Sequence, residues 1–167
     1  PVDKHYLYGT PYAVRLSAGI GAPTVAGFGT DFAGTVDAVG PGVTRFKPGD
    51  EVFGVADGAV GEFVVRRAEG GIALKPASVG FDQAAALPVA AVTALQALRD
   101  KARVAPGQKV LINGASGGVG TFAVQIAKAL GAEVTGVCST RNVELVRSIG
   151  ADHVIDYTQE DFTQGEA

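Results

Sequence analysis

The chain has 167 residues, of which 47% are hydrophobic and 19% are charged, and its formal net charge is −3. This composition is typical of a globular protein and excludes an intrinsically disordered chain. Because no block of like charge occurs, we expect no nucleic-acid partner.

The sequence also predicts a cytoplasmic protein without a membrane partner. No apolar run is long enough to span a bilayer, and no basic and then apolar signal opens the chain. Cys138 is the single cysteine, so no internal disulfide and no thiolate zinc site can form, and we expect no metal. The abrupt start at Pro1 and the absence of methionine predict an internal segment of a longer protein.

The first 75 residues predict β structure. Short alternating runs lie between glycine and proline residues, with strands expected at 34–39 and 61–65 and with turns at Pro41-Gly42 and Pro48-Gly49. Near Phe81 the pattern changes to helix, with Asp82 as the expected N-cap and Pro88 as a break before residues 89–99. We expect a domain border there, between residues 1–82 and 83–167.

Strands and helices alternate in the second half. β-rich pieces occur at 110–112, 133–137 and 153–157, and amphipathic helices ending at Gly131 and Gly150 fill the gaps. This order predicts a parallel sheet with right-handed crossovers. A doubly wound nucleotide-binding domain needs two such halves, and the chain contains only the first.

A glycine-rich segment follows the first of these strands directly and opens a helix. Read as Ala115-x-Gly117-x-x-Gly120, it matches the dinucleotide-binding fingerprint, in which Gly117 lets the backbone approach the pyrophosphate and Gly120 allows close helix packing. The phosphates are expected at the helix N-terminus. The alternative is an ordinary tight connection between strand and helix.

The same residues match the nucleophile elbow of serine hydrolases, with Ser116 as nucleophile. That reading requires an acid and then a histidine downstream, and the only later histidine is His153, at the start of an expected strand. Strand packing is the alternative for His153. The hydrolase therefore remains a remote alternative.

The segment after the second strand predicts the choice of cofactor. An NAD-binding fold places Asp or Glu there, whereas this chain has Ser139, Thr140 and Arg141. Hydroxyl groups and a guanidinium suit a 2′-phosphate, so we expect NADPH. The alternative is helix capping by Ser139 or Thr140, with Arg141 in solvent.

Several motifs together resemble the medium-chain dehydrogenase/reductase superfamily, and more narrowly its zinc-free quinone oxidoreductase branch. They are Gly29–Gly34, Phe46–Phe53, Leu87-Pro88, Thr93-Ala94 and Gly114–Gly120. The resemblance covers almost the whole chain. It implies an α/β protein in which a GroES-like irregular β-barrel portion, residues 1–82, precedes the first half of a Rossmann doubly wound parallel sheet, residues 83–167.

The resemblance also implies site residues. Thr93 resembles the threonine near the nicotinamide, and Ser139 and Tyr157 resemble residues at the adenosine phosphate, although Tyr157 has strand packing as its alternative. Weak catalytic candidates are Asp3, Tyr6 and Tyr8. The residues that resemble the pyrophosphate loop, with the last glycine of the fingerprint, are Ser116, Gly117, Gly118, Val119 and Gly120.

Zinc-dependent members of the superfamily have Gly-His-Glu where this chain has Gly29-Thr30-Asp31, so the histidine ligand is replaced. Their cysteine ligand falls before Pro1. The resemblance therefore implies zinc-independent hydride transfer from NADPH to a quinone or an α,β-unsaturated carbonyl compound, and a possible homodimer. The alternatives are an alcohol dehydrogenase-type reductase and a nucleotide-binding fragment without turnover.

Overall fold

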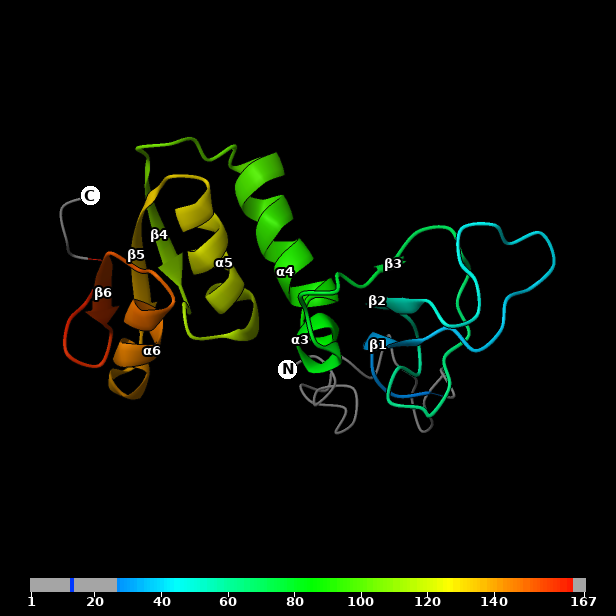
Figure 1. Ribbon diagram of the computed structural model, residues 1–167. Coiled ribbons are helices and arrows are strands. Elements are labelled where there is room, and N and C mark those ends of the chain that lie inside the picture. Colours follow the sequence, from blue (N-terminus) through cyan, green and yellow to red (C-terminus); the bar gives the residue numbers. More distant parts are fainter. Residues whose placement is uncertain (1–12, 14–26, 164–167) are drawn as a thin grey trace. The chain divides into compact units, whose positions relative to one another are not determined.

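The computed structural model describes residue 13 and residues 27–163. The chain divides into two compact units, Pro1–Val89 and Ala90–Ala167. Each unit has its own three-stranded sheet, antiparallel in the first and parallel in the second (Figure 1). Within the described residues no helix is both long and apolar enough to cross a bilayer.

The first unit is built on strands β1 (Asp31–Thr35), β2 (Glu51–Val55) and β3 (Ile72–Leu74), in that order in the sheet. Just before β2 the chain turns at Gly49, whose φ is +90°, and the Asp50 carboxylate accepts the Lys47 N–H at 2.9 Å. This left-handed geometry is open to glycine at little cost. The turn predicted at Pro48-Gly49 is therefore confirmed.

The strand predicted at 61–65 is wrong, and the one predicted at 34–39 overlaps β1 only at its first two residues. Gly58 has a φ of +78°, and its carbonyl accepts the Gly61 N–H at 3.0 Å. This turn uses backbone groups that a strand would offer to a neighbour. The side chains of Phe63 and Val65 are exposed, so no burial favours a strand here.

The helical region begins with α3 (Phe81–Ala85) and α4 (Pro88–Leu95), followed by the π-helix η1 (Gln96–Lys101). The predicted break at Pro88 is confirmed, since proline is favoured in the first helical turn, where an N–H is not needed. The N-cap predicted at Asp82 is wrong. The N-cap of α3 is Gly80, whose N–H donates to the Gln83 side chain at 3.1 Å.

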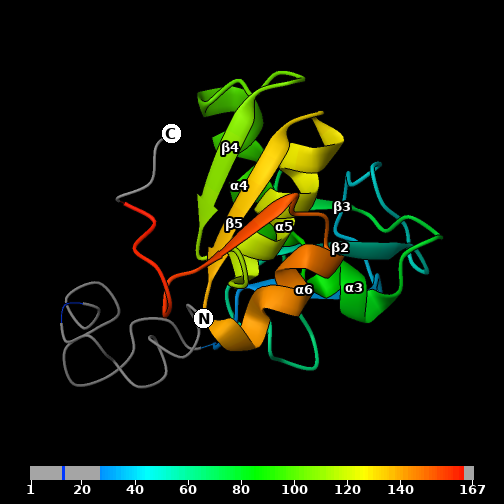
Figure 2. The ribbon, with the colours of Figure 1, turned by 90° about the vertical axis from the view of Figure 1, so that its left-hand side faces the viewer.

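The second unit alternates strands and helices as the sequence predicts. Strands β4 (Lys109–Asn113), β5 (Glu133–Cys138) and β6 (His153–Asp156) are parallel and adjacent in that order. Helix α5 (Gly118–Ala129) contacts β4 and β5, and α6 (Val143–Ser148) contacts β5 and β6 (Figure 2). The 3-10 turn η2 (Thr140–Asn142) joins β5 to α6.

The hydrophobic core of the second unit lies between these helices and the sheet. Val124 of α5, Val134 of β5 and Val146 of α6 have no exposed surface. Gly136 of β5 lies directly under α6, because a Cβ there would be 3.1 Å from Ala115 Cβ and would collide with the Val146 side chain. The core therefore holds the carboxyl ends of β4 and β5, and the segments that follow them, in fixed positions.

Candidate functional site

The glycine-rich loop begins where β4 ends. Gly114 has a φ of +72°, which favours glycine, and its carbonyl accepts the Gly117 N–H at 2.9 Å. Gly117 is the N-cap of α5, and its extended backbone directs the chain into the helix. The expected strand, glycine-rich turn and helix are therefore all present.

Gly120 allows α5 to lie close to this loop. A Cβ at Gly120 would be 2.9 Å from Ala115 Cα and would collide with the Gly114 carbonyl oxygen. The packing role predicted for Gly120 is therefore confirmed. A Cβ added at Gly118, two residues earlier, would have no atom of another segment within 4 Å, so the loop is open on that side.

The first turn of α5 presents unpaired backbone donors. Among the described residues, the N–H groups of Gly118, Val119 and Gly120 meet no acceptor. Free N–H groups and the positive end of the helix dipole favour an anion at such a position. Gly118 and Val119 are exposed, so phosphate oxygens can reach these donors.

A second cluster of polar groups lies at the carboxyl end of β5. Asn142 Nδ2 donates to Ser116 Oγ at 3.0 Å and to Ser139 Oγ at 3.3 Å. This amide joins the glycine-rich loop to the residue that follows β5, and all three side chains are half-buried. The sequence did not single out Asn142 as a site residue, because no local pattern predicts its contact with Ser116, 26 positions earlier.

Capping does not account for these side chains. Ser139 is the N-cap of η2 and Asn142 is the N-cap of α6, but neither side chain makes a capping hydrogen bond. The backbone N–H of Asn142 donates to the Ser139 carbonyl at 2.9 Å instead. The capping alternative is therefore wrong for Ser139.

Thr140 points into a different hydrogen-bond chain. Its hydroxyl lies 2.7 Å from the Thr158 hydroxyl, which in turn donates to the Asp156 carboxylate at 2.7 Å. Either hydroxyl can donate in the Thr140–Thr158 contact, and both threonines also form hydrogen bonds with the Asp156 carboxylate. The Thr140 and Thr158 hydrogen bonds hold the pKa of Asp156 below its usual value, so this carboxylate remains anionic.

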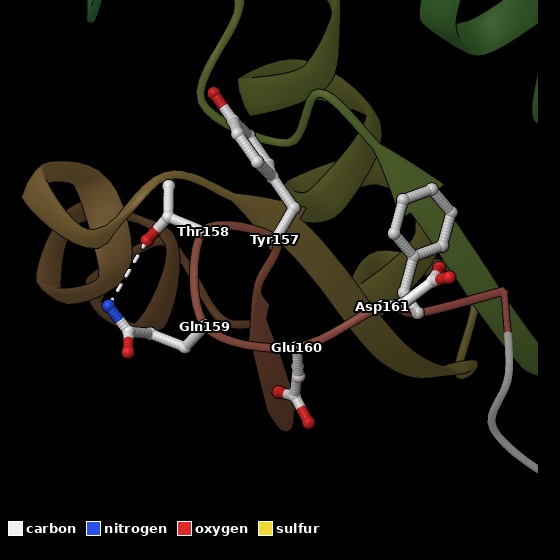
Figure 3. Close-up of a pocket in the computed structure, with 6 residues that line it drawn as sticks. Tyr157, Thr158, Gln159, Glu160 and Asp161 are labelled. Atoms are coloured by element: carbon white, nitrogen blue, oxygen red, sulfur yellow. Dashed lines mark hydrogen bonds between the residues drawn. The ribbon is translucent and has the colours of Figure 1, made fainter.

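Arg141 and Tyr157 are both exposed. Within residues 27–163 Arg141 forms no ion pair, so its guanidinium faces solvent. The Tyr157 side chain is exposed after the last residue of β6, with 56% of the residue's surface accessible, which does not support the alternative of a packed ring. A surface cavity of about 300 Å³ lies along residues 157–162 (Figure 3).

The geometry contradicts a serine hydrolase. Ser116 follows the carboxyl end of β4, whereas His153 is the first residue of β6, at the amino end of the parallel sheet. His153 Nε2 lies 3.0 Å from Glu133 Oε1, and the Ser116 hydroxyl contacts Asn142. Nucleophile and base are at opposite ends of the sheet. His153 is also exposed rather than packed within the strand layer.

The remaining sequence candidates fall into two groups. Thr93 lies on α4 and is exposed. Asp3, Tyr6 and Tyr8 lie outside the described residues. The catalytic role suggested for these three residues stays a prediction.

The segment at the family's zinc position contains no zinc-ligand pattern. Thr30 offers a hydroxyl, which is a poor zinc ligand, and the Asp31 carboxylate accepts the Val89 N–H at 2.7 Å. No group of three or more His, Cys, Asp or Glu side chains suited to a metal occurs in the described part of the chain. The donor set that the structure describes does not fit zinc.

Comparison with known proteins places this geometry in a family. The alcohol dehydrogenase GroES-like domain matches residues 1–95, and the family described as zinc-binding dehydrogenase matches residues 118–165. A quinone oxidoreductase homolog of the Arabidopsis thaliana chloroplast envelope is 48% identical over 137 residues, covering 77% of this chain and 41% of the relative.

Two further matches come from a fungus and a bacterium. A trans-enoyl reductase of Aspergillus terreus is 40% identical to this chain. The match covers 96% of this chain and 46% of the reductase. The quinone oxidoreductase structure from Coxiella burnetii has a TM-score of 0.87 and 35% identity, and covers 100% of this chain and 53% of that one. The chain thus spans about half the length of its relatives.

The fold and the loop define a protein with a GroES-like portion and the first half of a Rossmann-type parallel sheet. The chain belongs to the medium-chain dehydrogenase/reductase superfamily, and it is quinone oxidoreductase-like. The resemblance and the fold class expected from the sequence are confirmed. The cytoplasmic location and the border at residues 82 and 83 stay predictions.

Proposed function

We propose that this protein binds NADPH in its second unit and transfers hydride from it to a quinone or an α,β-unsaturated carbonyl compound without a metal. The observation that carries the proposal is the loop between β4 and α5. The backbone N–H groups of Gly118 and Val119 are unpaired at the N-terminus of α5. Gly120 lets this helix pack against the loop, because a Cβ there would collide with the loop backbone. Such a loop binds the pyrophosphate of a dinucleotide.

The 2′-phosphate is assigned to the segment after β5. Residues 138–142 contain no acid, and Arg141 is exposed and unpaired among the described residues. Asn142 connects the Ser139 hydroxyl to Ser116 of the glycine-rich loop, which supports a role for Ser139 as a donor to the phosphate. The Thr140 hydroxyl already interacts with Thr158 and Asp156, so Thr140 is proposed to contribute its backbone to the phosphate site.

Relatives named quinone oxidoreductase and enoyl reductase support the substrate class. Bound nicotinamide would supply the hydride, and the protein would orient the reacting carbons. We assign the substrate side to residues 1–82 and cofactor binding to residues 83–167. Thr93 at the nicotinamide, Tyr157 at the adenosine, and Asp3, Tyr6 or Tyr8 near the substrate remain parts of the proposal. The full-length protein is proposed to form a homodimer.

Metal independence rests on the donors at the superfamily's zinc position. Thr30 replaces an imidazole, and the only thiol of the chain, Cys138, is buried in the second unit with its pKa raised by that burial. Elemental analysis of protein purified without added metal tests this directly. Zinc present in stoichiometric amount after treatment with a chelator would overturn it.

Cofactor choice is tested by fluorescence titration with NADPH and NADH. In Ser139→Asp a carboxylate would repel the 2′-phosphate and accept a bond from a free ribose hydroxyl, so the preference for NADPH should fall about 100-fold or more. Arg141→Ala should weaken NADPH binding about tenfold through loss of one charge-assisted contact. NADH binding should change little in Arg141→Ala.

Arg147→Ala is the matched control. Arg147 is also exposed, but it pairs with Glu144 on α6, so its removal changes the net charge equally without touching the segment after β5. Equal binding of NADH and NADPH by the unaltered protein, with neither site variant changing the ratio, would contradict the assignment of the 2′-phosphate.

A further inference from the structure

One amide connects two hydroxyl groups that come from different parts of the second unit. Ser116 belongs to the loop before α5 and Ser139 follows β5, and Asn142 Nδ2 donates to both oxygens at 3.0 and 3.3 Å. Ser116 and Asn142 are 26 residues apart in sequence. The contact therefore fixes the position of the glycine-rich loop relative to the end of β5.

The direction of these hydrogen bonds decides what the hydroxyls can still do. An amide nitrogen is a donor only, so each serine oxygen accepts from Asn142 and keeps its own proton. Within residues 27–163 neither Ser116 nor Ser139 donates that proton to any acceptor. Two half-buried hydroxyl protons are thus available to one ligand that carries several acceptor oxygens.

The charges around this pair favour an anion. No acid occurs between Cys138 and Asn142, and Arg141 is exposed in the same turn. The nearby carboxylate, that of Asp156, accepts hydrogen bonds from Thr158 and Thr140, and these donors compensate its charge. A phosphate monoester accepts from two hydroxyls and pairs with a guanidinium, so it fits these donors.

We propose that Asn142 is a positioning residue, which holds the Ser116 and Ser139 hydroxyls so that both donate to the 2′-phosphate of NADPH. The inference rests on the proposed function and adds to it a residue and a mechanism of selectivity. Asn142 itself does not touch the phosphate. It acts by supplying donors to the serine oxygens, which leaves the serine protons for the ligand.

Calorimetric titration of the full chain with adenosine 2′,5′-bisphosphate and with AMP measures this effect, because the two probes differ only in the 2′-phosphate. The preference for the bisphosphate is the dissociation constant of AMP divided by that of the bisphosphate. This ratio should fall about tenfold in Asn142→Ala, since charge-assisted bonds from the serines lose their alignment. In Asn142→Asp it should fall about 100-fold, because an acceptor then takes the serine protons and repels the phosphate.

Two controls separate positioning from folding. In Asn142→Asp the carboxylate can accept from both serine hydroxyls and lies at the N-terminus of α6, where negative charge is favourable, so the melting temperature should stay that of the unaltered chain. Gln125→Glu makes the same change from amide to carboxylate at an exposed position of α5 outside the segments assigned to the cofactor, and the ratio should stay within about twofold of the original. Ser116→Ala and Ser139→Ala should each lower the ratio. When either is combined with Asn142→Ala, the double variant should lose less than the sum of the two single effects, because the residues act together.

The outcomes distinguish this inference from the proposed function. If the unaltered chain prefers the bisphosphate and the Asn142 variants keep that preference, the positioning role is wrong while NADPH binding stands. Equal losses for both probes would also overturn it, because Asn142 would then act on the adenosine or on the fold. If the unaltered chain does not distinguish the probes, the assignment of the 2′-phosphate itself is wrong.

Discussion

The two units bury their apolar residues in different ways. In the described part of the first unit the buried hydrophobic residues are few and lie on β2, on α3 and in loops: Phe46, Val52, Ala56 and Ala84. In the second unit a continuous cluster runs from α4 and η1 through the sheet to α6. The second unit therefore depends on close packing of helices against strands, whereas the first depends more on turns and backbone hydrogen bonds.

This difference explains why the proposed cofactor site lies where it does. The glycine-rich loop and the segment after β5 are both anchored in the packed cluster, through Ala115 and Cys138. A site that must place hydroxyls and N–H groups within fractions of an ångström benefits from such rigid support.

The largest expected effect comes from closing the gap between α5 and the loop. Gly120→Ala should lower the free energy of unfolding by about 3 kcal/mol, since the added methyl group meets backbone atoms that cannot move aside. Gly118→Ala is the matched control, because its Cβ enters open space, and it should raise stability by about 0.5 kcal/mol. Urea denaturation followed by circular dichroism measures both, and equal effects would show that α5 is not closely packed.

A smaller loss of stability is expected from removing one buried side chain, and its size should differ between the two units. Val134→Ala removes a side chain with no exposed surface from the central cluster and should cost about 2 kcal/mol. Val52→Ala makes the same change on β2 of the first unit and should cost about half as much, because fewer buried neighbours line the space left behind. Hydrogen exchange read by mass spectrometry reports each unit separately. A greater loss at Val52 would reverse the comparison.

The smallest expected effect concerns a polar contact of the second unit. Asp152 accepts from Lys128 Nζ at 2.7 Å and from the Val134 N–H at 2.7 Å, and these bonds hold its pKa below the usual 3.8. A lowered pKa in the folded state stabilises the protein above the unfolded-state value, and this contribution is lost as the pH falls through the folded-state pKa. The stability difference between the unaltered chain and Asp152→Asn should therefore be constant near neutral pH and shrink below about pH 4.

Lys128→Gln is the partner variant for this test. It removes the hydrogen bond from Lys128, which lowers the pKa of Asp152 most, and leaves the bond from the Val134 N–H in place. When Asp152→Asn is made in the Lys128→Gln protein, the stability difference that it causes should depend less steeply on pH than in the unaltered chain. Thermal melts at a series of pH values provide the measurement, and a difference that does not shrink in acid would contradict the lowered pKa.

Local pattern was sufficient to predict the second unit. The spacing of Phe122, Ile126 and Leu130 predicts the face of α5 that packs on the sheet, and Gly131, with a φ of +83°, ends that helix. The first unit was predicted less well. The alternation of polar and apolar residues at 61–65 predicts a strand only weakly, and the chain forms a turn at Gly58 instead.

The sequence by itself determined the parallel unit, the glycine-rich loop and the family, because these depend on periodicity and on glycines at short spacing. Only the tertiary structure decided which side chains meet. Asn142 reaches Ser116 across 26 positions, and the Asp31 carboxylate receives the Val89 N–H across 58. Such contacts depend on how strands are brought together by the packed core, and no short pattern encodes them. For the same reason the hydroxyls of Ser139 and Thr140, adjacent in sequence, have different partners.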